Sequence, residues 1–193
     1  MAAGERQRRG QNSNEFGLEL AVRFRRNALA QLKFMNLGDI LSPAQIIPEL
    51  HASNRWEAID ELLNNLIDTG KIKSEHREPI AAEVKKRESQ MSRGIGFGVA
   101  IPHASKGLNA DLISEVTGAL GRSKKGVNFD SLDNKPANVV MLLLVPQGQM
   151  QKHLHTLASI AKLLNKNEFR QILEAAPDAQ AIYQIIKDQS GAK

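Results

Sequence analysis

Residues 94–103 constrain this chain more than any other stretch: three alternating glycines, a short apolar run, a proline and a histidine (Gly-Ile-Gly-Phe-Gly-Val-Ala-Ile-Pro-His). Glycine allows positive φ and leaves its amides uncovered. Val99–Ile101 indicates a short buried strand, which Pro102 ends. His103 is therefore expected at a strand end, beside a loop whose amides could face an anion. Because imidazole is reversibly protonated near neutral pH, His103 is the leading candidate for chemistry.

Along the remaining chain, short apolar runs that indicate strands alternate with segments of helical periodicity. This alternation predicts an α/β layered domain. A capping pair at Asn54 and Glu57 and a closing Gly70 bound the first helix. Gly121 and Gly126 are predicted to frame a turn between two strands. The predicted helices cover about residues 54–70, 74–90, 149–165, 168–176 and 179–187, and the strands 99–101, 112–120, 127–129 and 139–145.

The composition limits the classes of protein to consider. With 41% apolar residues the chain can bury a core, and without cysteine it has neither disulfides nor thiol chemistry. No apolar run approaches the roughly 18–20 residues of a membrane span, and no signal peptide is visible. We therefore expect a cytoplasmic protein with no membrane span.

Basic charge is concentrated at the N-terminus. Residues 1–34 hold seven basic and three acidic side chains, a net of +4, which leaves 19 basic and 18 acidic side chains in residues 35–193. A nearly neutral body argues against binding of nucleic acid. The sequence predicts a basic arm at 1–34, partly disordered or helical, and one domain at 35–193. Residues 18–33 suit a helix packed on its own domain or a neighbour; a partner, membrane-surface or transit role is the weaker alternative.

The glycine run closely resembles the signature Gly-Ile-Gly-x-Gly-Ile-Ala-Ile-Pro-His of enzyme IIA of the fructose/mannitol/nitrogen-regulatory type, from the bacterial phosphoenolpyruvate phosphotransferase system. The resemblance extends over about residues 36–188. It implies a single domain with a mixed β-sheet sandwiched between helical layers. It also implies that His103 is the phosphorylated nucleophile.

Two more histidines fall at the start of the predicted helix 149–165. Helical periodicity places His153 at the edge of the buried arc that Leu154, Leu157 and Leu164 define, and turns His155 outward. The resemblance agrees, since it implies that His153 is a second active-site histidine that stabilises the phosphoryl group. For His155 we prefer a solvated surface role.

Arg87 precedes His103 by sixteen residues, on a charged stretch that by itself indicates a solvated helix face. The family has an Arg-Glu pair at this spacing, so the resemblance implies that Arg87 supplies positive charge to the phosphate. A guanidinium suits phosphate geometry.

Other kinds of site fit less well. The spacing Gly-x-Gly-x-Gly after a helix is not the dinucleotide fingerprint. A metal site at His103, His153 and His155 is disfavoured, because the two helical histidines diverge by about 200°. We expect no cofactor and no metal.

The resemblance implies a phosphocarrier that accepts its phosphoryl group from the phosphohistidine of an HPr-type carrier protein. The acceptor is then a IIB domain, or phosphorylation controls the binding of regulated proteins. His-Leu-His-Thr-Leu at 153–157 is similar to nitrogen-regulatory members and favours that subtype; a sugar-specific fructose/mannitol-type IIA is the alternative. A homo-oligomer is left open.

Overall fold

The computed structural model describes residues 37–90, 96–131 and 133–191. The predicted helix over 18–33, the boundary at residue 35, and Gly94 and Ile95 of the glycine run lie outside these residues. In chain order the elements are α2 (Leu37–Ile40), η1 (Pro43–Gln45), β1 (Ile46–Ile47), α3 (Arg55–Asp68), η2 (Ser74–His76), α4 (Arg77–Gln90), β2 (Val99–Ala100), β3 (Thr117–Val127), β4 (Ala137–Leu144), α5 (Met150–Leu164), α6 (Asn167–Ala175) and α7 (Ala179–Gly191).

The strands form one sheet in the order β1-β3-β4-β2. β3 and β4 are antiparallel, whereas β1 pairs with β3 and β2 pairs with β4 in parallel. The predicted mixed sheet is therefore confirmed, and β2, which leads to His103, is an edge strand.

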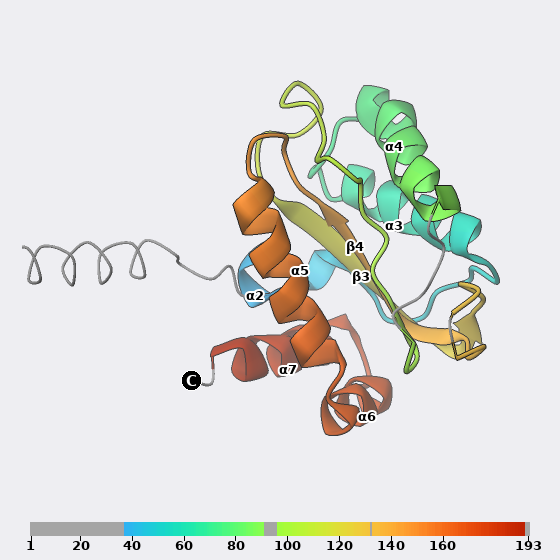
Figure 1. Ribbon diagram of the computed structural model, residues 1–193. Helices are drawn as coiled ribbons and strands as arrows, with labels where there is room; N and C mark the ends of the chain where they lie inside the picture. The colour runs from blue at the N-terminus through green and yellow to red at the C-terminus, as the bar shows by residue number, and fades with distance from the viewer. Residues whose placement is uncertain (1–36, 91–95, 132, 192–193) are drawn as a thin grey trace, which may run out of the picture. The chain divides into compact units, whose positions relative to one another are not determined.

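Helices cover both faces of the sheet (Figure 1). Both faces need cover because the apolar side chains of β4 alternate between the two faces and join two separate apolar clusters. Val140 and Leu142 join the cluster of α3 and α4, while Met141 and Leu143 join the cluster of α2, α5, α6 and α7. The strand predicted at 139–145 is thus buried on both sides, as a continuous apolar run indicates.

Side-chain caps confirm several predicted helix limits. The Asn54 side-chain oxygen accepts hydrogen bonds from the amides of Trp56 (3.0 Å) and Glu57 (3.1 Å) at the start of α3. Gly70, with φ +68°, follows its C-terminus. At α7 the Asp178 carboxylate accepts from the amide of Ala181 at 2.8 Å. These caps satisfy amides that a helix start leaves without a partner.

The strand predicted at 112–120 is confirmed only from Thr117 on, and the turn predicted between Gly121 and Gly126 is wrong. β3 begins only at Thr117 and continues through Gly121 to Val127, with its register shift between Arg122 and Val127. Gly121 is required by close packing, because a Cβ at this position would lie 2.6 Å from a methyl carbon of Leu50. The turn chemistry of glycine therefore does not apply at this position.

Arg122 joins β3 to the end of α6. Its side chain is buried (4% exposed). Its Nε donates to the Pro48 carbonyl at 2.8 Å, and its Nη1 donates to the carbonyls of Leu173 (3.1 Å), Glu174 (3.1 Å) and Ala176 (2.5 Å). The guanidinium thus satisfies carbonyls that the last turn of a helix leaves unpaired.

Within the described residues, no helix is both long and apolar enough to cross a membrane.

Candidate functional site at His103

His103 is held in register with the sheet just beyond β2. The Leu143 amide donates to the Pro102 carbonyl at 3.0 Å, and His103 forms a parallel bridge with Leu143. Because side chains alternate along a strand, His103 shares the face of Val99 and Ile101, which the α5–α7 layer covers. The sequence prediction of a strand-end histidine is confirmed.

The backbone selects the tautomer of the His103 ring. Nδ1 lies 2.8 Å from the carbonyl oxygen of Ile101. A carbonyl only accepts, so Nδ1 carries the hydrogen and donates it. In the neutral ring the lone pair is then on Nε2, which is the nucleophilic atom.

The surroundings of His103 favour the neutral ring. Its side chain is half-buried, and burial is the largest cause that lowers its pKa below the usual 6.5. The hydrogen bond to Ile101 acts in the opposite direction, and the positive charge of Arg87 lowers the pKa further. An unprotonated Nε2 near neutral pH follows from this balance.

Arg87 lies in the last turn of α4, and its charge acts on His103. Sequence alone indicated a solvated helix face, whereas the side chain is half-buried. The structure therefore brings Arg87 and His103, two of the three predicted site residues, into one electrostatic environment. Such a cation is suited to a nearby phosphate.

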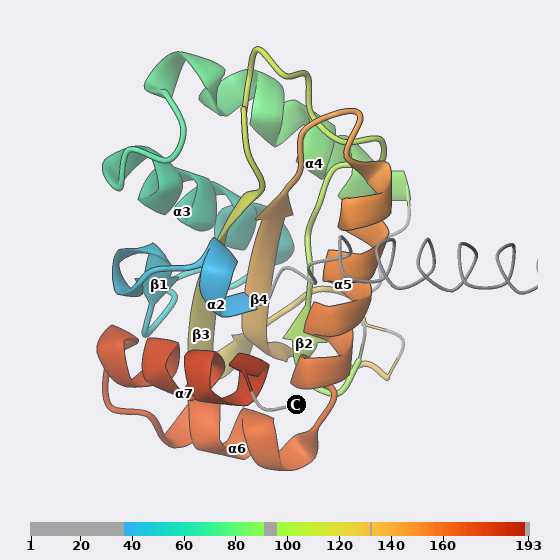
Figure 2. The same cartoon turned by 90° about the vertical axis from the view of Figure 1, so that its left-hand side faces the viewer.

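His153 lies in the first turn of α5, and its side chain is outside the described part of the chain. Since β2 and β4 are parallel, His103 and the end of β4 lie at one end of the sheet, and the chain turns from there into α5 (Figure 2). Position 153 lies within about 60° of Thr156 and Ile160, which are buried, whereas position 155 lies about 140° from Ile160. The helical phase thus agrees with the predicted difference between the two histidines, whose roles stay predictions.

Leu154 corrects one detail of that prediction. It was expected in the buried arc of the helix, but it is 62% exposed. The buried stripe instead follows Thr156, Ile160 and Leu164. An apolar residue type does not by itself indicate a buried position, because exposed single apolar residues are common.

The described part of the glycine run lies away from His103. The Gly98 carbonyl accepts from Asn138 (2.8 Å), near the start of β4, whereas His103 pairs with Leu143 near its end. The five residue steps from Asn138 to Leu143 along an extended strand span about 16 Å. The expectation that the amides of Gly96–Gly98 face an anion at His103 is therefore wrong.

The turn has a different partner. The Phe97 amide donates to the Asp133 carboxylate at 2.8 Å. This hydrogen bond is the largest cause that lowers the pKa of Asp133. Phe97 itself has φ +57°, between two glycines that also have positive φ. No sequence pattern indicates this contact, because Asp133 lies 36 positions further along the chain.

In the part of the chain that the structure describes, no three His, Cys, Asp or Glu side chains are arranged to hold a metal ion.

Known proteins resemble this chain over most of its length. The family model described as "Phosphoenolpyruvate-dependent sugar phosphotransferase system, EIIA 2" matches residues 39–189. A nitrogen regulatory protein of Bradyrhizobium diazoefficiens is 30% identical over 152 residues, which cover 79% of this chain and 95% of that protein. A PTS system fructose-specific EIIA component of Haloferax volcanii is 30% identical over 157 residues, which cover 80% of this chain and 98% of that protein.

A solved structure is similar as well. The crystal structure of nitrogen regulatory protein IIA-Ntr from Neisseria meningitidis superimposes with a TM-score of 0.68 at 27% identity, and covers 78% of this chain and 98% of that one.

The mixed sheet between helical layers and the match over 39–189 define a component of the phosphoenolpyruvate-dependent phosphotransferase system. Within that system the chain belongs to the EIIA family. The family predicted from the glycine run is confirmed, and both regulatory and sugar-specific members are among its relatives.

Proposed function

We propose that this chain is a phosphocarrier that holds a phosphoryl group on Nε2 of His103. The observation that carries the proposal is the 2.8 Å contact between Nδ1 and the Ile101 carbonyl, which leaves Nε2 as the nucleophile. Family membership supports a phosphotransfer role, and the lowered pKa of His103 keeps the ring neutral.

The donor in this proposal is the phosphohistidine of an HPr-type protein. The Nε2 lone pair attacks phosphorus as the P–N bond of the donor breaks, and that electron pair stays on the donor imidazole. The His103 ring keeps its Nδ1 hydrogen and gains a positive charge, which the Ile101 carbonyl stabilises. Such a transfer depends on positioning and charge neutralisation rather than on further covalent chemistry.

Arg87 and His153 stabilise the transferred group. Arg87 provides a permanent positive charge on the side of α4, and its influence on the pKa of His103 supports this role. His153, on α5, donates a hydrogen bond to a phosphoryl oxygen. Its helical position supports the assignment.

We place the chain in the nitrogen-regulatory subtype, where phosphorylation of His103 alters the binding of partner proteins. The His-Leu-His-Thr-Leu segment and the similarity to nitrogen regulatory proteins support this placement. The similarity to a fructose-specific component supports the alternative, transfer from His103 to a IIB domain.

Labelling with phosphoenolpyruvate and the general phosphotransfer proteins tests the site. The phosphate should be acid-labile, should map to His103 by mass spectrometry, and should be absent from His103→Gln. His76→Gln is the matched control, since His76 is also half-buried with Nδ1 near a carbonyl, that of Leu112 at 3.0 Å. Labelling that persists in His103→Gln contradicts the proposal.

The subtype is tested separately. Phosphorylated protein is mixed with a purified fructose-type IIB domain, and loss of label from His103 is followed. Rapid transfer to the IIB domain supports the sugar-specific alternative. Retention of the label, together with partners captured by only one phosphorylation state, supports the regulatory subtype.

A further inference from the structure

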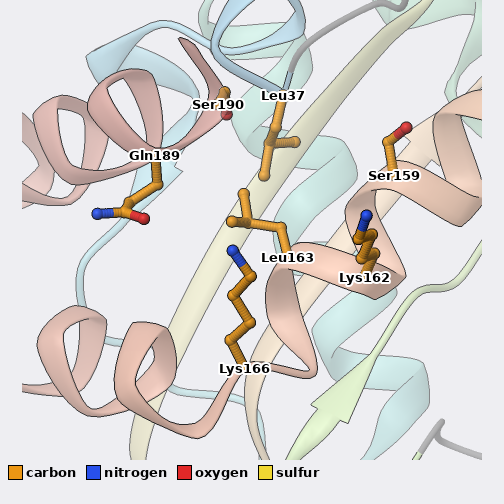
Figure 3. A pocket seen from close by; sticks show the side chains of 7 residues that line it. All are labelled: Leu37, Ser159, Lys162, Leu163, Lys166, Gln189 and Ser190. Carbon is orange, nitrogen blue, oxygen red and sulfur yellow. The ribbon is translucent and has the colours of Figure 1, made fainter. Parts of the chain in front are cut away.

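A pocket in the helical layer lies between α2, α5 and α7 (Figure 3). Its cavity volume is about 200 Å³, and it is lined by Leu37, Ser159, Lys162, Leu163, Lys166, Gln189 and Ser190. Lys162 is nine residues from position 153, and a helix rises about 1.5 Å per residue, so the two are about 14 Å apart along α5. The pocket is therefore separate from the proposed phosphotransfer site.

The charged side chains that line the pocket among the described residues are both basic. Lys162 lies in the last turn of α5, and Lys166 follows that helix as the N-cap residue of α6. Neither ammonium forms an ion pair with any residue in the described ranges. At this N-cap no side-chain hydrogen bond caps the helix, and the partial positive charge there adds to that of the two lysines.

The remaining wall offers hydrogen-bond donors and an apolar surface. Ser159, Gln189 and Ser190 supply two hydroxyls and an amide, and Leu37 and Leu163 supply the apolar part. The Ser190 hydroxyl oxygen is buried and has no hydrogen-bond partner among the described residues. A buried polar atom without a partner is uncommon in folded proteins and calls for an explanation, such as a missing ligand.

We propose that this pocket binds a small organic phosphate. A phosphate monoester carries about −1.5 to −2 charge near neutral pH, which the ammonium groups of Lys162 and Lys166 can match. Its oxygens accept from hydroxyls and amides, and its carbon skeleton packs on the leucines. The volume equals that of about six or seven water molecules, enough for a compound of a few carbons.

The basic arm does not suit the same pocket. Residues 1–34 carry a net charge of +4, which has the same sign as the charges of Lys162 and Lys166. An anionic small molecule fits the charge, and the arm does not.

Calorimetric titration of the full chain tests the proposal with glycerol 3-phosphate, glucose 6-phosphate, inorganic phosphate and succinate as probes. At least one phosphate ester should bind saturably and more tightly than succinate. The variant Lys162→Gln/Lys166→Gln should weaken that binding by about tenfold or more, because charge-assisted hydrogen bonds are lost. Ser190→Ala should weaken it by a smaller factor.

Lys124→Gln/Lys125→Gln is the matched control, since it removes the same charge from exposed residues of β3. It should leave the binding within about twofold. An equal loss in both double variants would show general electrostatic attraction and would overturn the proposal, as would tighter binding of succinate or no saturable binding of either ester. Labelling of His103 verifies that each variant is folded, and its outcome is independent of this pocket.

Discussion

The Nδ1 atom of His103 lies 2.8 Å from the carbonyl oxygen of Ile101, two residues earlier in the chain. Pro102 stands between them, and its ring fixes φ. The Pro102 carbonyl in turn accepts from the amide of Leu143, which anchors the segment to β4. A backbone group that does not titrate therefore selects the tautomer of His103, and the Nε2 lone pair stays available over the whole pH range in which the ring is neutral.

The link between Arg87 and His103 predicts a pH effect. Arg87 lowers the pKa of His103, so Arg87→Gln should raise it, and Arg87→Lys should not. With the higher pKa, a larger fraction of the molecules has a protonated ring below about pH 6.5. As the pH is lowered, the labelling rate of His103 should therefore begin to fall at a higher pH than in the wild type. NMR titration of the ring hydrogens measures the pKa directly.

The same variant tests catalysis. At pH 8 the ring is neutral in both proteins. Arg87→Gln should still label about 100-fold more slowly, because the positive guanidinium that stabilises the phosphoryl group is lost. Lys86→Gln removes a neighbouring exposed charge and serves as the control. An unchanged pKa together with an unchanged rate would remove Arg87 from the site.

The two histidines of α5 should differ. His153→Ala should lower the labelling rate about 100-fold if its side chain donates to the phosphoryl group. His155→Ala should change the rate by less than about twofold, as surface substitutions usually do. Comparison of initial rates at pH 7.5 measures both, and equal losses would contradict the helical phase argument.

The turn at Gly96–Gly98 should be dispensable for the chemistry. Asp133→Asn removes the charge that accepts from the Phe97 amide, so this amide should exchange faster with deuterium. Because the turn lies about 16 Å from His103 along the strand, labelling should keep its wild-type rate. If Asp133→Asn lowered the labelling rate as much as Arg87→Gln does, the glycine turn would have to contribute to the active site.

Much of the fold was predictable because local signals agreed with the tertiary structure. Asn54, Gly70 and Asp178 each act at a helix end, and the apolar run of β4 is buried on both faces. β3 was predicted less well. Gly121 is needed for its close contact with Leu50, 71 positions earlier. The sequence does not distinguish a glycine required by close packing from a glycine required by a turn.

The candidate site was predictable only in part. The strand-end placement of His103 follows from a local run of residues. The position of Arg87 depends on how α4 packs, and its own helix has too weak an apolar periodicity to show which side is covered. The Asp133 contact joins distant segments, so only the structure reveals it.

Arg122 predicts a large stability effect. Arg122→Ala leaves the carbonyls of Leu173 and Ala176 without their buried donor, so the free energy of unfolding should fall by about 3 kcal/mol. Urea denaturation measures the change. Lys124→Ala, exposed on the same strand, should change stability by less than about 0.5 kcal/mol. Similar losses in the two variants would contradict the role assigned to the guanidinium.

The basic arm provides the last prediction. Arg87, His103 and the whole family match at 39–189 lie beyond it, so a chain that starts at Met35 should fold and keep its labelling rate at His103. The arm carries +4 of the +5 net charge. Its removal should therefore change salt-dependent association with a partner or with a second copy, which light scattering at two ionic strengths measures.

The full-length chain is the control for both measurements. An isolated helix of about the length of residues 18–33 is marginal in water, so any helix there needs a surface to pack on. Circular dichroism of the shortened chain separates a folding defect from a docking defect. If that chain folds but accepts no phosphate from the HPr-type donor, the arm belongs to the donor interface, and the functional domain begins before residue 35.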